Sequence, residues 1–489
     1  MQNIRRASAA VLILLGSSVA LAQATSPLRS SVEAAVNTSP EVSAKFNAYR
    51  ASVDAVDVAR SGFLPHLDAS ANVGQTQERF SAVTPADVSL PQRQAGLNLT
   101  QLLWDGMGTA NDVARTGHDR LARYFELLDA TEQTALEAAR AHYDVQRYRR
   151  LVQLAEDNYV QHRYIYLQIQ SRVKAGIGRG VDLEQAAARV ALAESNLVTE
   201  TANLHDVTAR YERVVGAPPP KEISTIEVLR AGVPQTQSET TTLAVQRSAA
   251  VSASIENLRS VRSTVDADKS AYQPRVEARL RGTGGKNVDL LQNMNRSGTA
   301  EIALSWNLYN GGADQARVHQ QVRLLGQAED LRDKTCRDTR QTAEIAFNDI
   351  RKLQDQLVYL ERNTLSIEKA RDAYRQQFDI GQRSLLDLLN SENEVYTARR
   401  AYANAEYDLG FAYARTLASM NQFGAQLGIV KVDNAASDAA GWEQGGDAPT
   451  RCPVPVAETY ATDHSELEAR AQRLAELAPK LPLPAAAKP

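Results

Sequence analysis

Ionisable residues gather at two short interruptions of an otherwise helical sequence. The first is SRVKAGIGRGVDLEQAAAR at 171–189, and the second is QQFDIGQRSLLDLLNSENE at 376–394. Each interruption is followed by an aspartate, Asp182 or Asp387, in the predicted first turn of a new helix. These carboxylates have two interpretations. They stabilise a helix N-terminus, or they form an acidic ring that attracts cations at the narrowest point of a symmetric pore.

Neither interruption has the spacing of a catalytic or cofactor-binding motif. The glycine-rich GIGRG at 176–180 lies between two predicted helices and lacks the G-x-G-x-x-G spacing, so we reject a nucleotide loop. The match of SIEK at 366–369 to S-x-x-K falls within a helix, and the chain has no H-E-x-x-H, nucleophile elbow or P-loop. His118, His142 and His162 are interpreted as surface positions of a long helix. We therefore expect a protein that is not an enzyme and that holds no cofactor and no metal.

The two interruptions belong to a unit that occurs twice in the chain. The separation between Gly176 and Gly381 equals that between Asp182 and Asp387, and the same offset brings the segment LLWDGMG close to NLYNGGA. The glycine is expected to provide the backbone conformation that ends one helix, and Ser384 to cap the next. Each repeat is therefore expected to fold into the same set of elements.

Composition excludes one class of partner and indicates export. The chain has 489 residues with 55 basic and 58 acidic side chains, a formal net charge of -3, so nothing favours a nucleic-acid partner. Residues 1–24 have the features of a secretory signal peptide, because Arg5 and Arg6 precede an apolar run at 7–22. No later run reaches the roughly 18 uncharged apolar residues of a membrane helix. Any membrane-spanning part must therefore consist of strands.

Apolar and polar residues alternate in two predicted β-hairpins, at 65–104 and 274–309. One interpretation is a soluble antiparallel sheet with one solvent-exposed face. The other is the wall of a membrane barrel, apolar toward lipid and polar toward a lumen. Aromatic residues at the strand ends, Trp104, Trp306 and Tyr309, favour the second interpretation, because Trp and Tyr concentrate at membrane interfaces.

Two proline-free stretches predict unusually long helices, at 108–175 and 313–380. At 1.5 Å per residue each would be roughly 100 Å long. The remaining predicted helices are shorter and either precede a hairpin or return from an interruption: 28–62, 241–272, 181–215 and 386–423. The simplest packing places a return helix end to end with a pre-hairpin helix, beside one long helix.

The predicted organisation is two structural repeats, at 25–220 and 241–424, joined by a linker at 221–240. An Ala- and Pro-rich tail follows at 425–489, with one short helix expected at 464–477. The fold class is mainly α with a β portion. Two hairpins supply four strands, which cannot close a barrel, and open edges are not tolerated in lipid. Two copies would supply eight strands and three would supply twelve with a lumen, so a trimer with an open bore is the simplest solution.

The order of helix, hairpin, long helix, tip and return helix, found twice between about 28 and 424, resembles the TolC-like outer-membrane channel-tunnels of Gram-negative bacteria. The resemblance implies that a homotrimer forms a twelve-stranded outer-membrane barrel, continued by a twelve-helix tunnel that projects into the periplasm. It also implies contacts with outer-membrane lipid, a periplasmic adaptor (membrane fusion protein), an inner-membrane ABC or other transporter, and an exported protein or small molecule.

The resemblance assigns roles to residues of the two interruptions. The positions that match the constriction closing the resting tunnel are Asp182, Phe378, Arg383, Asp387 and Asn390. The family usually has tyrosine at 378 and aspartate at 390, so Phe378 and Asn390 cannot make the bonds of that hydroxyl and that charge. The tips that would dock the adaptor contain Gly176, Arg179, Gly381 and Arg383.

The expected function is a passive export duct. Type I protein secretion competes with small-molecule efflux, and the segment at 336–350 and the cysteine-bearing tail look similar to the branch that secretes large adhesins. A periplasmic coiled-coil scaffold without a pore is the alternative from a different class. Adaptors of that class carry a single helical hairpin, whereas this chain has duplicated hairpins.

The two cysteines, Cys336 and Cys452, are expected to form a disulfide. Their spacing excludes the usual zinc patterns, and export to an oxidising compartment permits pairing. Cys336 would lie roughly 68 Å from the tip, and the return helix would end roughly 65 Å from it, near 424. The tail therefore starts at nearly the same distance from the tip as Cys336, and a disulfide would fix the tail to the helices. Two unrelated thiols are the alternative.

Overall fold

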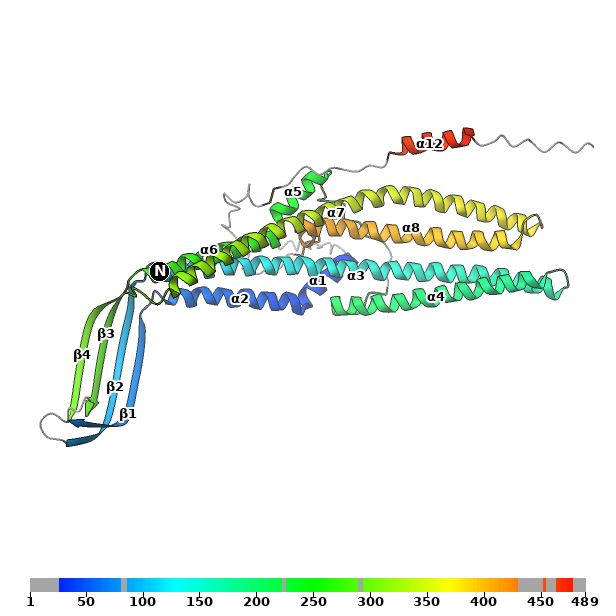
Figure 1. The fold of residues 1–489 in the computed structure, drawn as a ribbon. Coiled ribbons are helices and arrows are strands. Elements are labelled where there is room, and N and C mark those ends of the chain that lie inside the picture. The colour runs from blue at the N-terminus through cyan, green and yellow to red at the C-terminus, as the bar shows by residue number, and fades with distance from the viewer. Residues whose placement is uncertain are drawn as a thin grey trace, which may run out of the picture.

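The computed structural model describes residues 26–80, 86–221, 226–288, 293–429, 452–453 and 463–477. The described part is a long bundle of helices with a four-stranded sheet at one end (Figure 1). The predicted signal peptide at 1–24 lies outside the described residues, as does most of the predicted tail at 425–489.

Two helices of 67 residues run through the bundle, α3 (Gly108–Lys174) and α7 (Ala313–Asp379). Their bounds lie close to the predicted 108–175 and 313–380. Each follows a residue in the left-handed conformation, Met107 or Gly312, which turns the chain from the sheet into the helix. A helix of this length spans about 100 Å.

The helix expected at 28–62 is two helices, so the prediction of a single element there is wrong. α1 (Pro27–Thr38) is followed after one residue by α2 (Pro40–Ser61). Pro40 lacks the N–H that a continuing helix would need. The Ser39 hydroxyl accepts a hydrogen bond from the Val42 N–H at 3.4 Å and so caps the second helix.

The helix expected at 241–272 is broken in the same manner. The elements are α5 (Gln237–Arg247), α6 (Ala249–Asp268) and the 3-10 helix η1 (Lys269–Tyr272). Ser248 separates the first two, and its hydroxyl accepts from the Val251 N–H at 3.3 Å. α5 starts inside the predicted linker at 221–240. Each repeat therefore has a capped break before its hairpin.

The return helices are α4 (Gly180–Val215) and α8 (Leu385–Ser419). α8 ends before the predicted 423, and a separate turn, α9 (Phe423–Gln426), follows it. The carboxylate of Glu132 on α3 accepts from the backbone N–H groups at the start of α9, at 2.5 Å from Phe423 and 3.2 Å from Gly424. This contact fixes the end of the second repeat to the long helix of the first.

The helices pack as two columns that lie side by side. α2, α1 and α4 follow one another along α3, while α6 and α8 follow one another along α7 (Figure 1). This is the end-to-end packing predicted from the helix lengths. α12 (His464–Leu477) coincides with the short helix expected in the tail, and its His464 ring lies 6.4 Å from the Tyr359 ring of α7.

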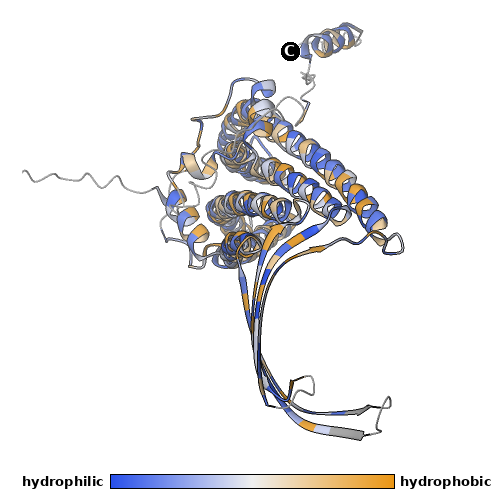
Figure 2. Ribbon diagram, turned by 90° about the vertical axis from the view of Figure 1, so that its left-hand side faces the viewer, coloured by the Kyte–Doolittle hydropathy of each residue, from blue (hydrophilic) through white to orange (hydrophobic). Residues whose placement is uncertain are grey.

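The sheet is antiparallel with strand order β1-β2-β3-β4. The strands are β1 (His66–Phe80), β2 (Ala86–Trp104), β3 (Arg275–Lys286) and β4 (Met294–Ser305). Its register aligns side chains of one kind across all four strands. One row contains Leu67, Leu99, Leu280 and Ala300, and the next contains Asp68, Asn98, Arg281 and Thr299. Since neighbouring rows point to opposite faces, one face is mainly apolar and the other mainly polar in the half of the sheet nearer the helices. Farther along the strands, Arg93, Lys286 and Arg296 lie on the first face. The colours alternate along the strands (Figure 2).

The core is largest at the middle of the bundle, where both repeats meet. Residues of α1, α3, α4, α8 and α9 pack there, among them Leu28, Ala138, Tyr211, Leu417 and Phe423. A second cluster joins α7 to α8 through Ile350, Leu353, Leu409 and Tyr413. The α7 residues of that cluster are part of the apolar seam that the sequence spacing of three and four predicts.

Candidate functional site

The two interruptions form turns with the same backbone hydrogen bonds at the end of the bundle opposite the sheet (Figure 1). In the first turn, the Gly176 N–H donates to the Val173 carbonyl and the Ile177 N–H to the Arg172 carbonyl, both at 3.0 Å. In the second turn, the Gly381 N–H donates to the Phe378 carbonyl at 3.0 Å and the Gln382 N–H to the Gln377 carbonyl at 2.8 Å. Both turns are Schellman motifs, which require a left-handed residue. We call residues 174–183 the first tip and residues 379–388 the second tip.

The two aspartates lie in the first turns of the return helices. Ser384 caps α8, because its hydroxyl accepts from the Asp387 N–H at 3.2 Å. Asp182 occupies the first turn of α4, where Arg179 at the N-cap position makes no side-chain capping bond. Within the described residues, neither the Asp182 carboxylate nor the Arg179 guanidinium has a hydrogen bond or ion pair. Both aspartates therefore benefit from the helix dipole, and both retain exposed oxygen atoms.

Arg383 is held inside the second tip by three groups. Its Nη1 lies 3.6 Å from an Asp387 carboxylate oxygen. Its Nε donates to the Gln377 side-chain oxygen at 3.0 Å, and its guanidinium lies 4.6 Å from the centre of the Tyr374 ring. The sequence analysis placed Arg383 in the tip and named none of these three partners. Gln377 and Tyr374 could have been found from helical spacing, since they lie on the last turns of α7.

Phe378 is a core residue of the single subunit and is only 7% exposed. It belongs to an apolar cluster that contains residues from both repeats: Ile165, Ile169, Ala186, Leu385, Leu388 and Leu389. The guanidinium of Arg172, at the end of α3, lies 5.1 Å from the ring centre. The side chain that the family resemblance assigns to the constriction thus packs between the two tips within the subunit.

Asn390 also contacts the other repeat. Its side-chain oxygen accepts a hydrogen bond from Arg189 Nη2 of α4 at 2.7 Å. No sequence pattern singles out Arg189, because an arginine on a helix usually indicates a solvated surface. Of the five predicted constriction residues, Arg383 and Asp387 therefore form an ion pair with each other. Phe378 contacts Arg172 and Asn390 contacts Arg189, both in the first repeat. Asp182 makes no hydrogen bond or ion pair through its side chain within the described residues.

Two of the three histidines interpreted as surface residues are buried, so that interpretation is wrong for them. His142 and His162 are each 2% exposed. His142 Nδ1 shares a 3.0 Å hydrogen bond with the Ser31 hydroxyl, which also bonds the Tyr211 hydroxyl at 2.8 Å. Burial lowers the pKa of His142 to about 4. His118 is partly exposed and lies 2.7 Å from a carboxylate oxygen of Glu256 on α6.

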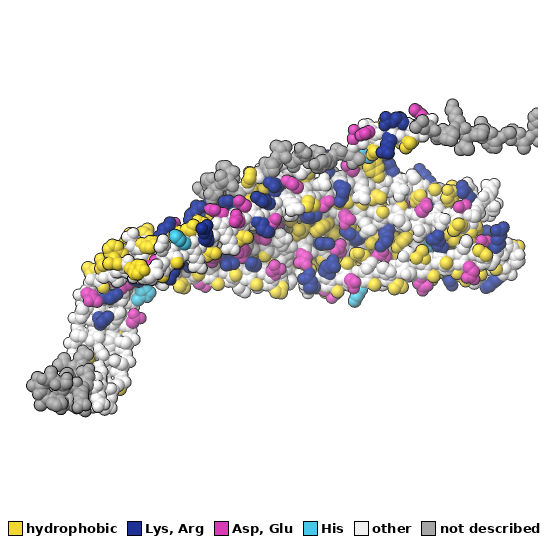
Figure 3. Space-filling view, viewed as in Figure 1, with side chains coloured by type: hydrophobic (Ala, Val, Ile, Leu, Met, Phe, Trp, Pro, Cys, Tyr) yellow, Lys and Arg dark blue, Asp and Glu magenta, His cyan; other side chains and the backbone are white. Residues whose placement is uncertain are grey.

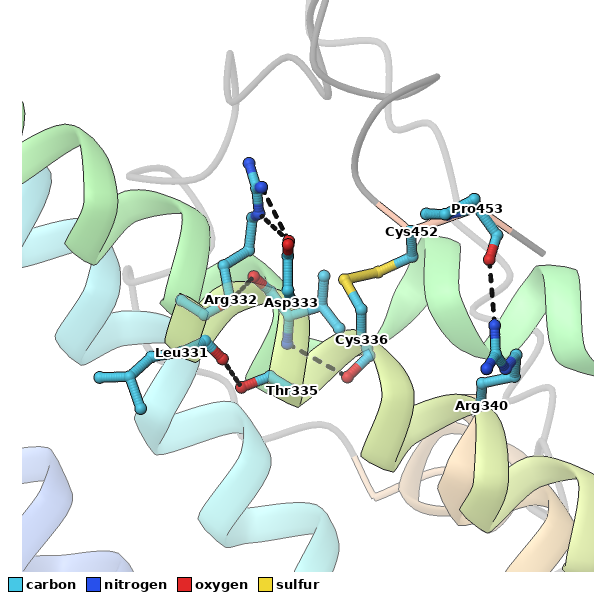
Figure 4. The surroundings of a disulfide bond; sticks show 11 residues. Leu331, Arg332, Asp333, Thr335, Cys336, Arg340, Cys452 and Pro453 are labelled. Carbon is cyan, nitrogen blue, oxygen red and sulfur yellow. Dashed lines mark hydrogen bonds and ion pairs between the residues drawn. A yellow bond between two sulfur atoms is a disulfide. The ribbon is translucent and has the colours of Figure 1, made fainter. Parts of the chain in front are cut away.

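The structure contains a disulfide between Cys336 and Cys452, with Cα atoms 5.4 Å apart (Figure 4). Cys336 lies on α7 and packs against Val245, Val251 and Ile255 of the neighbouring helices. Next to the bridge, Arg340 Nη1 donates to the Pro453 carbonyl at 3.2 Å (Figure 4). The segment at Cys452 is therefore attached to the first half of α7 by a covalent bond and a hydrogen bond.

Two features are absent from the part of the chain that the structure describes. No group of three or more His, Cys, Asp and Glu side chains is arranged to hold a metal ion. No helix there combines the length and the apolar character that a membrane crossing requires.

Comparison with known proteins gives consistent matches across both repeats. The profile of the outer membrane efflux protein family matches residues 31–217 and 241–421. The outer membrane efflux protein BepC of Brucella suis is 26% identical over 429 residues, which cover 86% of this chain and 91% of BepC. The alkaline protease secretion protein AprF of Pseudomonas aeruginosa is 25% identical over 338 residues, covering 64% of this chain and 67% of AprF. The fold is similar to the crystal structure of the CmeC outer membrane channel of Campylobacter jejuni, with a TM-score of 0.70, 14% identity, and coverage of 88% of this chain and 90% of CmeC.

Proposed function

The chain belongs to the outer membrane efflux protein family of TolC-like channels, and we propose that three copies of it form the exit duct of an export system. The protein resides in the outer membrane of a Gram-negative cell, with its helices in the periplasm. In the proposed trimer, three sheets close into a twelve-stranded barrel and the helices continue it as a twelve-helix tunnel.

The observation that carries the proposal is a sheet with two open edges and two different faces. Among the described strands, β1 and β4 each pair on one side only. Unpaired backbone groups cost several kcal/mol each in lipid, so these edges need partners from other copies. Eight strands would enclose only side chains, whereas twelve leave a lumen. A polar face toward that lumen and an apolar face toward lipid match the two faces of the sheet.

Aromatic residues support the position of the membrane. Hydrophobic side chains gather where the sheet meets the helices (Figure 3). Trp306 is 54% exposed and Tyr309 is 83% exposed at this junction. Trp and Tyr favour the boundary between lipid and water. We therefore infer that the periplasmic surface of the membrane lies at the junction and that the sheet crosses the bilayer.

Type I protein secretion is the preferred system, with an ABC transporter and a periplasmic adaptor as partners. The segment at 336–350 and the disulfide-linked tail look similar to that branch of the family, and AprF is named as a secretion protein. The second candidate is small-molecule efflux, which the name of BepC favours. In either system the duct is passive and is energised by the inner-membrane transporter.

The tips are the proposed periplasmic end of the duct. Threefold symmetry would repeat Asp182 and Asp387 three times each, which gives acidic rings that favour cations. Arg383 would restrain the second tip through Asp387. We also propose that Gly176, Arg179, Gly381 and Arg383 form the surface that docks the adaptor, because both turns project at the end of the bundle (Figure 1).

Purified mature protein tests the proposal directly. Its mass in detergent should be that of a trimer, and it should produce ion conductance in planar lipid bilayers. A monomer without conductance would exclude the duct and leave the scaffold without a pore. Secretion and efflux are then separated by deleting the gene and measuring both exported protein and drug susceptibility.

A further inference from the structure

Three cations interrupt the apolar face of the sheet at the end that points away from the helices (Figure 1). They are Arg93 on β2, Lys286 on β3 and Arg296 on β4, and all three residues are exposed. Arg93 pairs directly with Lys286, while Arg296 pairs with Gly284 and is therefore diagonal to Lys286. Neighbours of these two kinds have Cβ atoms about 5 to 8 Å apart, so the charges form one cluster. We call Arg93, Lys286 and Arg296 the outer cations.

No described side chain neutralises the outer cations. Within the described residues, none of the three makes a hydrogen bond or an ion pair through its side chain. The polar face differs, because the Glu277 carboxylate accepts from Arg275 Nε at 2.5 Å and from Arg279 Nη2 at 2.8 Å. Like charges directly opposite each other destabilise an antiparallel pair of strands. An anion from another molecule would therefore stabilise the pair of Arg93 and Lys286.

The outer cations lie at the level where the membrane ends in the proposed duct. Trp104 and Trp306 stand at the junction with the helices, where the periplasmic surface of the membrane is placed. Arg93 and Arg296 are each about ten residues along their strands from these tryptophans, and a tilted strand crosses a bilayer in about 9–11 residues. A cation on the lipid side is costly at the bilayer midplane and tolerated at the interface. In the duct, the cluster therefore faces the headgroups of the outer leaflet.

A shallow apolar trough lies between the outer cations and the helices on the same face. Its lining residues are apolar or lack a side chain: Leu97, Leu280, Gly282 and Gly298. A Cβ added at either glycine would meet no atom within 4 Å, so the space over the backbone is open. Arg296 stands at the far end of the trough, where its Cγ would lie 3.7 Å from a Cβ added at Gly284. The trough can hold an acyl chain, because it is apolar and continues the lipid-facing surface.

We propose that the outer cations and the trough bind a phosphorylated lipid of the outer leaflet, with a phosphate at the cations and an acyl chain in the trough. This inference rests on the proposed function, because only a sheet that crosses the bilayer brings the cluster to the outer leaflet. Arginine and lysine bind phosphate oxygens through charge-assisted hydrogen bonds. The same phosphate relieves the repulsion between Arg93 and Lys286. Each subunit of the trimer carries one such site.

Lipid binding by purified trimers tests the inference. The probe is lipid A with both of its phosphates, and the comparison lipid is lipid A without phosphate. Native mass spectrometry should find lipid A bound at up to one molecule per subunit, and no dephosphorylated lipid at the same concentration. A lysine or arginine beside an anionic lipid contributes about fivefold in affinity. The triple variant Arg93→Ala, Lys286→Ala and Arg296→Ala should therefore bind lipid A roughly a hundredfold more weakly.

Arg281→Ala is the matched control, because Arg281 lies on the same strand as Lys286 and on the opposite face. This variant should keep the wild-type affinity. Thermal unfolding supplies a second readout that does not depend on the triple variant. Without lipid A, Lys286→Ala should unfold at the wild-type temperature or above it, because the repulsion with Arg93 is removed. With lipid A, the same variant should gain less stability than wild type.

The outcomes separate this inference from the proposed function. Monomeric wild-type protein that forms no pores would contradict the proposed function. Trimers that conduct but bind both lipids equally, or that bind lipid A equally well without the outer cations, would overturn the lipid site and leave the duct. Inorganic phosphate is the remaining probe. If it raises the unfolding temperature of the trimer as much as lipid A does, the cluster binds soluble anions and the lipid assignment is wrong.

Discussion

Gly176 and Gly381 have the same left-handed backbone conformation, with φ of 78° and 77°, at corresponding turns of the two repeats. No neighbouring atom would meet an added methyl group at either glycine. The cost of a side chain there is therefore backbone strain alone. The two turns are equivalent in conformation as well as in sequence.

This equivalence predicts the effect of Gly381→Ala. The left-handed conformation costs an L-residue roughly 1–2 kcal/mol, so the free energy of unfolding should fall by about that amount in denaturant titrations. Gly326→Ala is the matched control, because Gly326 lies inside α7 with open space around it and alanine favours a helix by up to about 1 kcal/mol. An unchanged stability of Gly381→Ala would contradict the requirement for a left-handed residue.

Asp387 and Arg383 should affect different properties of the channel. Asp387→Ala is expected to reduce cation selectivity, because it removes three carboxylates from one ring. Arg383→Ala is expected to raise resting conductance, because Asp387, Gln377 and Tyr374 lose their common partner. Reversal potentials and resting currents in bilayers measure the two effects. Arg60→Ala, which removes an exposed ion pair with Asp57, should change neither.

The disulfide predicts that exported protein contains no free thiol. Mass spectrometry after alkylation without reductant should find Cys336 and Cys452 unmodified and joined. In the chain-entropy account, a bridge that closes a loop of this size stabilises the folded state by about 4–5 kcal/mol, so reduction should lower the temperature of thermal unfolding. Recovery of two alkylated cysteines from the native protein would rule the bridge out.

His142 predicts a loss of stability in acid. Burial lowers the pKa of its imidazole to about 4, below its ordinary value of 6.5. As pH falls from 6.5 to 4, the unfolded chain takes up a proton that the folded protein does not. The free energy of unfolding should therefore decrease over that window, by up to about 3 kcal/mol per subunit. His142→Gln should flatten the pH profile of urea unfolding, and His205→Gln, at an exposed position of α4, should leave it unchanged.

Arg179 tests the docking surface without disturbing the second tip. It has no ion pair or hydrogen bond among the described side chains, so Arg179→Glu should leave folding intact. We expect trimers of this variant to reach the outer membrane while export falls to background. Arg50→Glu, an exposed change on α2 far from the tips (Figure 1), should export normally. Full export by Arg179→Glu would exclude the first tip from docking.

The long elements were predictable because their signals are local. The absence of proline predicted α3 and α7, and the alternation of apolar and polar residues predicted the two hairpins. The glycines predicted the turns at the tips. The break at Ser39 carries a local signal, because Pro40 follows it and a proline inside a helical pattern ends or kinks the helix. The break at Ser248 was missed because a one-residue break with its own cap leaves the apolar spacing nearly intact. Periodicity alone cannot detect such a break.

The missed side chains depend on contacts that are distant in sequence. α3 packs in turn against helices of both repeats, so it has no single solvent face, and His142 and His162 lie on sides that other helices cover. Arg172 and Arg189 contact residues about two hundred positions away, and no local pattern distinguishes them from solvated charges. An ion pair within one turn, such as Arg383 with Asp387, is visible in the sequence because both partners are close along it.

The disulfide also fixes an order of events during biogenesis. An exported chain enters the periplasm from its N-terminus, so Cys336 arrives 116 residues before Cys452. Over that interval its thiol is available to periplasmic oxidants and to other thiols. The native bond can close only after both repeats have crossed the inner membrane. A bonded Cys336 therefore marks a chain whose translocation has reached Cys452.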